Sequence, residues 1–212
     1  LALPFFSALC VQLLPRLRIG VPSEREAESL RRGPFLIGAL ASFMGGALAF
    51  SLLTQSLGLS PVVADYWWTK DLYHLRFQVD PLSAPFVLLL SGLGVIIHLH
   101  LAGQPLMDRP HHRAALLLTA QGCAAACCLS ADLILICFLL QLMLLCLWSL
   151  ASLDSPRPAN SMLSTTYLGS ALLLAGALLI WSRVGDASTA PLPMLLVAEE
   201  PSALGWIGLL LL

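Results

Sequence analysis

The sequence predicts an all-α integral membrane protein, a polytopic helix bundle with about six transmembrane helices and the start of a seventh. Apolar residues make up 58% of the chain and charged residues only 11%, whereas a soluble domain carries about 25% charged residues. The mean hydropathy is +0.86. Apolar runs near the ~20 residues that cross a ~30 Å hydrocarbon core recur along the chain. They lack the apolar–polar alternation of a membrane barrel, so helices are the remaining solution in lipid.

The apolar runs place the helices in order along one membrane domain, residues 1–212. The first run has no basic segment before it and no small-residue cleavage site after it, so we expect a membrane helix with its first residues missing rather than a signal peptide. The last run is too short to cross a membrane, and we expect the natural polypeptide to continue beyond it. The predicted spans are about 1–14, 35–57, 82–103, 113–129, 132–150, 162–181 and an incomplete span at 203–212.

Basic residues in the short loops predict the orientation, because cytoplasmic loops are enriched in Lys and Arg. The loops after the first, third and fifth spans hold eight such residues, and the loops on the other side hold three. We therefore expect an N-terminus outside the plasma (inner) membrane, and we assign that membrane to a bacterium. The eight are Arg16, Arg18, Arg25, Arg31, Arg32, Arg109, Arg113 and Arg157, and the three are Lys70, Arg76 and Arg183.

The segment between the second and third spans, residues 58–79, is rich in aromatic residues. It contains Tyr66, Trp67 and Trp68, followed by Tyr73 and His74. Tyr and Trp favour the headgroup layer, where an apolar ring and a polar edge are both satisfied. Two interpretations stay open: an interfacial or short-strand cap on the outer face, and a binding site for a ligand.

Several other functions are excluded or unsupported by the sequence. A net charge of −1 leaves no basic face for nucleic acid. The motifs of phosphate-binding loops, zinc proteases and serine hydrolases are absent. The six cysteines lie in apolar runs without zinc-type spacing, which predicts packing residues rather than a metal or redox site. We therefore expect no cofactor, no metal and no catalytic residue.

Two histidines lie near the cytoplasmic end of the third span. An ionisable group inside a membrane span is costly and is a functional candidate by default. His98 and His100 are two residues apart, a rotation of about 200° on a helix, so at most one of them faces the bundle. An inward imidazole could relay protons, because it titrates near neutrality. An interfacial, hydrogen-bonded histidine is the competing interpretation for each.

Gln141 is the other informative polar residue. It follows Asp132 by nine residues, which places it ~13 Å along a helix and close to the bilayer centre. An amide at that depth must find hydrogen-bond partners on neighbouring helices, but it cannot bind and release a proton. Gln121, Thr119 and Ser170 are further candidates for simple interhelical hydrogen bonds.

Two segments resemble a known family. Residues 77–83, Phe-Gln-Val-Asp-Pro-Leu-Ser, lead into an apolar helix that ends Ile97-His98-Leu99. This pattern is similar to the third helix of the antiporter-like subunits of respiratory complex I, where V-D-x-L-S leads to I-H-x-Y. The closest likeness is to the most distal of these subunits, which is related to the large subunits of multisubunit cation/proton antiporters. Residues 129–141 also resemble the family's fourth-to-fifth helix segment, L-A-x-N-L-L-x-x-x-x-x-W-E.

The resemblance implies roles for two positions and also exposes two departures. In the family the position of Gln141 is a glutamate that pairs with a lysine on a broken seventh helix, and residues 203–212 resemble the approach to that helix. Ser170 stands where many distal members carry an aspartate. Neither glutamine nor serine titrates near neutral pH, so this half of the protein lacks one partner of the usual charge pair.

Two hypotheses of function follow. In the first, the chain is the N-terminal half of a membrane subunit in a proton- or cation-translocating complex. That complex is a complex I-like NADH:quinone oxidoreductase, an antiporter or a proton-energised inorganic-carbon uptake system. Its expected partners are other membrane subunits, the lipid bilayer and protons or monovalent cations. The ion-path candidates are His98, His100, Gln141 and Ser170. In the second, the chain is a structural membrane subunit that conducts nothing.

Overall fold

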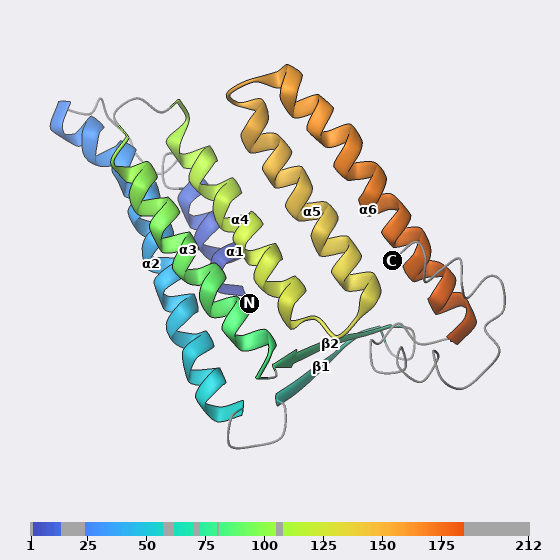
Figure 1. Ribbon diagram of the computed structural model, residues 1–212. Coiled ribbons are helices and arrows are strands. Elements are labelled where there is room, and N and C mark those ends of the chain that lie inside the picture. Colours follow the sequence, from blue (N-terminus) through green and yellow to red (C-terminus); the bar gives the residue numbers. More distant parts are fainter. Residues whose placement is uncertain are drawn as a thin grey trace.

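The computed structural model describes residues 2–13, 24–56, 62–69, 73–79, 81–104 and 108–184. The predicted incomplete span at 203–212 lies outside these residues. Six helices and a two-stranded hairpin make up the described part (Figure 1). In chain order they are α1 (Ala2–Leu13), α2 (Glu24–Ser56), β1 (Val62–Thr69), β2 (Tyr73–Val79), α3 (Ser83–Ala102), α4 (Pro110–Leu129), α5 (Leu133–Ser152) and α6 (Pro156–Val184).

The helices confirm the predicted fold class, a helical membrane bundle. Four of the described helices contain stretches long and apolar enough to cross a membrane, namely Arg32–Gln55, Ser83–Ala102, Leu133–Ser152 and Ala159–Leu179. The apolar part of α1, Pro4–Leu13, is shorter. Large apolar side chains on these helices remain exposed, which is typical of surfaces that face lipid or another membrane subunit.

Helix α4 differs from these four because it is not apolar enough to be a candidate membrane span. It occupies the predicted span 113–129, but it opens with Pro110, His111 and His112 and is rich in alanine. It packs against α1, α2, α3 and α5. The neighbouring helices therefore cover it, and a helix that faces protein needs less hydrophobicity than one that faces lipid.

The N-terminal part of α2 corrects one feature of the orientation argument. Arg25, Arg31 and Arg32 were assigned to a loop, but α2 begins at Glu24 and includes all three. The same holds for three further loop assignments, which lie in α4 (Arg113) and α6 (Arg157 and Arg183). A helix of 33 residues spans about 50 Å, which exceeds the ~30 Å hydrocarbon core. The helix continues because its backbone hydrogen bonds form equally well outside the lipid, where charged side chains are solvated.

The hairpin confirms the short-strand interpretation of the aromatic segment. Strands β1 and β2 pair antiparallel, with Val62 opposite Val79. The other edge of β2 contacts the α4–α5 connection, where the Ala131 N–H donates to the Arg76 carbonyl at 2.9 Å. The buried Asp132 then caps α5, because its carboxylate accepts the Leu135 N–H at 3.1 Å. The hairpin therefore closes the end of the bundle where α2, α4 and the starts of α3 and α5 meet (Figure 1).

The last two helices form a separate layer. In Figure 1, α5 lies beside α4, and α6 lies on the far side of α5. Their outward faces carry large apolar side chains, including Phe138, Leu145, Leu168 and Leu172. Core clusters lie among α1–α4 and between α4 and α5, and α6 packs on the outer side of α5.

Candidate functional site

The most extensive helix contact in the described bundle is between α2 and α3, and small residues line it. The buried residues of α3 recur at alternating intervals of three and four: Ala84, Val87, Ser91, Gly94 and His98. This spacing keeps one narrow stripe of α3 against its partner. Small side chains at such a contact let two membrane helices approach closely.

His98 lies at one end of this contact and is almost fully buried, with 1% of its surface exposed. A Cβ added to Gly38 of α2 would stand 2.2 Å from Cδ2 of the imidazole. The ring therefore occupies the space that the glycine leaves. Nδ1 lies 2.7 Å from the Gly94 carbonyl oxygen. Because a carbonyl only accepts, Nδ1 carries the hydrogen and Nε2 holds the lone pair of the neutral ring.

Nε2 of His98 is buried and has no hydrogen-bond partner among the described residues. A buried polar atom without a partner is uncommon and calls for a functional or solvent explanation. This nitrogen can accept a proton or a hydrogen bond from water.

Gln121 of α4 joins the same region from a third helix. Its side-chain oxygen accepts a hydrogen bond from the Ser42 hydroxyl at 2.8 Å, and Ser42 also lies 2.9 Å from the Gly38 carbonyl. The amide of Gln121 packs directly on Gly94, where an added Cβ would stand 2.4 Å from the amide oxygen. We call the residues Gly38, Ser42, Gly94, His98 and Gln121 the polar cluster.

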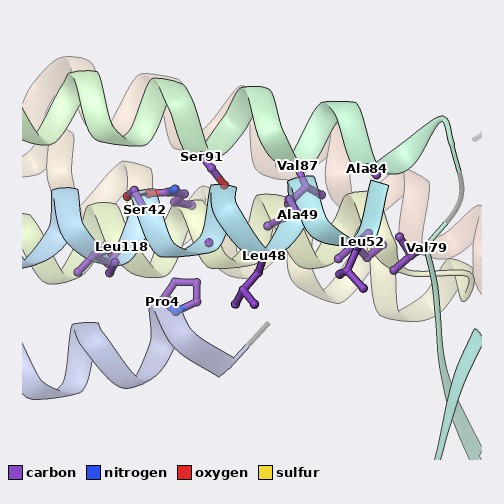
Figure 2. Close-up of a pocket in the computed structure, with 15 residues that line it drawn as sticks. Pro4, Ser42, Leu48, Ala49, Leu52, Val79, Ala84, Val87, Ser91 and Leu118 are labelled. Carbon is purple, nitrogen blue, oxygen red and sulfur yellow. Dashed lines mark hydrogen bonds between the residues drawn. The ribbon is translucent and has the colours of Figure 1, made fainter. Parts of the chain in front are cut away.

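A cavity of about 90 Å³ extends from the polar cluster toward the hairpin. Its lining includes Ser42, Ser91 and Gln121 and otherwise consists of apolar or small residues of α1–α4 and β2. Figure 2 shows Ser42 and Ser91 toward one end of the cavity and Val79 of β2 at the other. The space is large enough for water, which needs polar partners of the kind that the two serines and the amide provide.

The sequence-derived candidates do not converge on one site. His100 is exposed, and its Nε2 lies 3.3 Å from the side-chain nitrogen of Gln104. Of the two histidines, only His98 faces the bundle. Gln141 is half-buried on α5, and its side chain makes no hydrogen bond to the described residues. Ser170 is buried, but its hydroxyl donates to Tyr167 in its own helix at 3.0 Å. Thr119 likewise bonds within α4, to Ala115 at 2.8 Å.

Several members of the site were not expected from the sequence. Gln121 was assigned a simple interhelical bond, and it makes one. Ser42, Ser91 and the glycines opposite His98 and Gln121 were not singled out as site residues. One signal was present in the sequence: small residues at 38, 42, 45, 46 and 49 recur at helical spacing along α2. His111 was also overlooked, although its Nδ1 is buried without a partner among the described residues.

Comparison with known proteins shows the fold but no family. No protein-family model matches the chain, and no curated relative matches its sequence. Among solved structures, the chain is similar to one in the membrane-bound sulfane sulfur reductase (MBS), an archaeal respiratory membrane complex. The TM-score is 0.82 at 16% identity, over 99% of this chain and 42% of that chain. The chain thus spans less than half the length of this structural neighbour.

Proposed function

We propose that the chain is part of a membrane subunit in a proton-translocating respiratory-type complex. Two observations support this. The fold is similar, over nearly the whole chain, to part of a chain in an archaeal respiratory membrane complex. The single observation that carries the proton-moving role is His98, a buried imidazole whose Nε2 has no partner among the described residues. Such a group is costly in a membrane helix, so it is a functional candidate by default.

The chemistry of the polar cluster favours protons over metal cations. Its titratable group is an imidazole, which gains and loses a proton near neutral pH. No Asp or Glu lies in any of the six described helices beyond residue 28, so within them a sodium ion would find only neutral oxygens. Proton transfer needs a base and a chain of water or hydroxyl groups, and His98, Ser42 and Ser91 supply these.

The second candidate is a subunit that keeps the fold but conducts nothing. The observation in its favour is the neutral character of Gln141 and Ser170, which the family resemblance places on the usual ion path. In the first proposal His98 carries the titration instead, and Gln141 is a polar packing residue. The type of complex (complex I-like, antiporter or inorganic-carbon uptake), the partner subunits, the plasma-membrane location and the outside N-terminus are part of the proposal.

Proton flux in membrane vesicles separates the two candidates. The full-length protein is expressed with its complex, and flux is followed with a pH-sensitive dye. His98→Gln keeps a polar side chain but cannot titrate, and we expect it to lower flux at least about tenfold. His100→Gln is the matched control, an exposed histidine on the same helix, and should leave flux unchanged.

A second variant tests the position of Gln141. If His98 carries the protons, Gln141→Glu leaves the flux of the native protein largely as it is. If the native protein shows no flux and Gln141→Glu creates it, the chain is a silenced pump and the structural role is correct. Equal flux in the native and His98→Gln proteins would refute the assignment to His98.

A further inference from the structure

The cavity that α1–α4 and β2 enclose has one polar end and one apolar end. Ser42, Ser91 and Gln121 supply the polar groups, and the rest of the wall is apolar or small, including Val79 and Leu129 near the hairpin. The lining residues, all of them in the described part of the chain, carry no charge. Ligand sites commonly combine an apolar wall with a few polar groups that fix the orientation of the ligand. The lining therefore suits a neutral, amphipathic occupant.

Ser91 is the buried hydroxyl of this cavity that lacks a partner. Only 6% of its surface is exposed, and its hydroxyl makes no hydrogen bond to the described residues. Thr119 and Ser170, by contrast, each donate to a carbonyl of their own helix. Figure 2 shows the Ser91 side chain pointing from α3 toward α2. A buried polar group without a partner is uncommon, so this hydroxyl points to a bound molecule in the cavity.

The α2 surface opposite Ser91 leaves room for such a molecule. Gly45 and Gly46 face the serine, and Gly45 lines the cavity. A Cβ added to Gly45 would stand 3.6 Å from Oγ of Ser91, which is an ordinary van der Waals distance. An atom of a ligand therefore fits beside the hydroxyl without a clash.

Gln121 supplies a second free group at the same end. Its amide oxygen accepts the hydrogen bond from Ser42, whereas its amide nitrogen makes no hydrogen bond to the described residues. The amide packs on Gly94, which lies one helical turn from Ser91 on the same face of α3. A ligand oxygen between them can accept from the amide N–H and share a hydrogen bond with the Ser91 hydroxyl.

The size of the cavity and its position limit the shape of the occupant. Its volume of about 90 Å³ is smaller than the about 150 Å³ of an engineered protein cavity that holds benzene. A slender alkyl chain therefore fits better than a ring. Leu48 lines the cavity, is 54% exposed and lies in a stretch of α2 able to cross a membrane. The cavity wall thus continues into the lipid-facing surface, and the rest of a longer chain can stay in lipid.

We propose that the cavity binds the hydroxyl end of a neutral, linear, lipid-soluble alcohol, with Ser91 as its hydrogen-bond partner. A charged headgroup does not suit the site, because the lining offers no opposite charge and burial of an unpaired ion is costly. Water alone suits only the polar end, since apolar cavities stay dry. The bound alcohol excludes water from Ser42 and Gln121, so a lipid-soluble molecule regulates the polar cluster at this point. This inference goes beyond the proposed function and does not depend on it.

Photolabelling with an alcohol probe tests the site. The full-length protein in phosphatidylcholine nanodiscs is irradiated with a diazirine-bearing octanol, and mass spectrometry identifies the labelled peptides. We expect saturable labelling of residues 48–52 of α2. Gly45→Leu fills the cavity and should lower this labelling at least about tenfold. Gly92→Leu is the matched control, because nothing lies within 4 Å of a Cβ added there, and it should retain the labelling.

Ser91→Ala tests the hydrogen bond without adding volume. Loss of one hydrogen bond between neutral groups should weaken competition by unlabelled octanol about threefold to tenfold. Ser51→Ala, which changes an exposed serine of α2, should leave the competition unchanged. Octane has no hydroxyl, so it should compete equally well in the native protein and in Ser91→Ala.

Two results would overturn the proposal. Labelling that does not saturate, or that persists in Gly45→Leu, would show that the cavity holds no alcohol. Octanol competition that is unchanged in Ser91→Ala would refute the role of Ser91, and this comparison decides alone if Gly45→Leu does not fold. The flux assay is separate from these measurements. A protein with flux but no labelling refutes this proposal alone, and a protein with labelling but no flux refutes the proposed function alone.

Discussion

Residues of the same type have different surroundings in the two layers of the bundle, α1–α4 and α5–α6. Gln121 of α4 hydrogen-bonds Ser42 and packs on a glycine of α3. Gln141 of α5 is half-buried and has no hydrogen bond to the described residues. Both amides lie well inside an apolar helix. The difference teaches that a polar residue at membrane depth becomes part of a site only where small residues on neighbouring helices bring partners within reach.

Glycines repeat the contrast between the layers. Gly38 of α2 and Gly94 of α3 are contact points, and an added Cβ would meet the buried His98 or the half-buried Gln121 at less than 3.0 Å. Gly169 of α6 and Gly92, on the outer side of α3, have nothing within 4 Å of an added Cβ. Glycine is thus required for close packing on the inside of α1–α4 and can be replaced on the outer faces.

The largest expected effect comes from glycine-to-alanine substitution in the two layers. Gly38→Ala should destabilise the protein by about 1–3 kcal/mol, because the buried His98 ring cannot move away from the new methyl group. Gly169→Ala, the matched control on α6, should be neutral or stabilise by up to about 1 kcal/mol, since alanine favours the helix. Unfolding in mixed detergent micelles measures both. Equal destabilisation by the two variants would contradict the contrast between the layers.

Glutamine-to-leucine substitution gives the next largest contrast. Gln121→Leu removes the bond to Ser42 and should cost about 0.6 kcal/mol and at most about 1.7 kcal/mol, the average and the maximum for hydrogen bonds between membrane helices. Gln141→Leu should be neutral or stabilising, because no described partner is lost and an amide leaves an apolar surface. The same unfolding assay applies. A cost for Gln141→Leu equal to that for Gln121→Leu would show that Gln141 also has a structural partner.

The smallest expected effect concerns the ion pair that ties the layers together at one end. Arg113 of α4 bonds both carboxylate oxygens of Asp154, which follows α5, at 2.5 and 3.2 Å. Asp154 is largely exposed, so Asp154→Asn should cost under about 1 kcal/mol. Added salt should reduce the cost further, because it screens exposed charges. A loss of several kcal/mol, or one insensitive to salt, would contradict this assignment.

The pH dependence of this pair has a definite sign. The hydrogen bond from Arg113 lowers the pKa of Asp154 below its usual value of 3.8. The contribution of the Arg113–Asp154 pair to stability is therefore fully present above pH 3.8 and is lost as pH falls through the lowered pKa of Asp154. The difference in stability between the native protein and Asp154→Asn, measured from pH 6 down to pH 2.5, should shrink only below about pH 4.

The hydrophobic pattern of the sequence predicted much of the fold but only part of the site. Apolar runs located the helices to within a few residues except at two starts. Charged residues continue α2 outside the hydrocarbon, and α6 begins six residues before the predicted span, at Pro156. The two-residue spacing of His98 and His100 showed that at most one faces the bundle, and the structure confirms this. The choice between them, and the inclusion of Gln121, Ser42 and His111, depended on which helices are neighbours.

By itself, the sequence determined that this protein is a helical membrane bundle, because the cost of unpaired backbone in lipid leaves helices as the only solution for long apolar runs. The tertiary structure alone decided which polar residues act together. That selection depends on contacts between residues far apart in the chain, such as Ser42 with Gln121 and Gly38 with His98. Local spacing sets the face of a helix on which a residue lies, but only packing sets what that face meets.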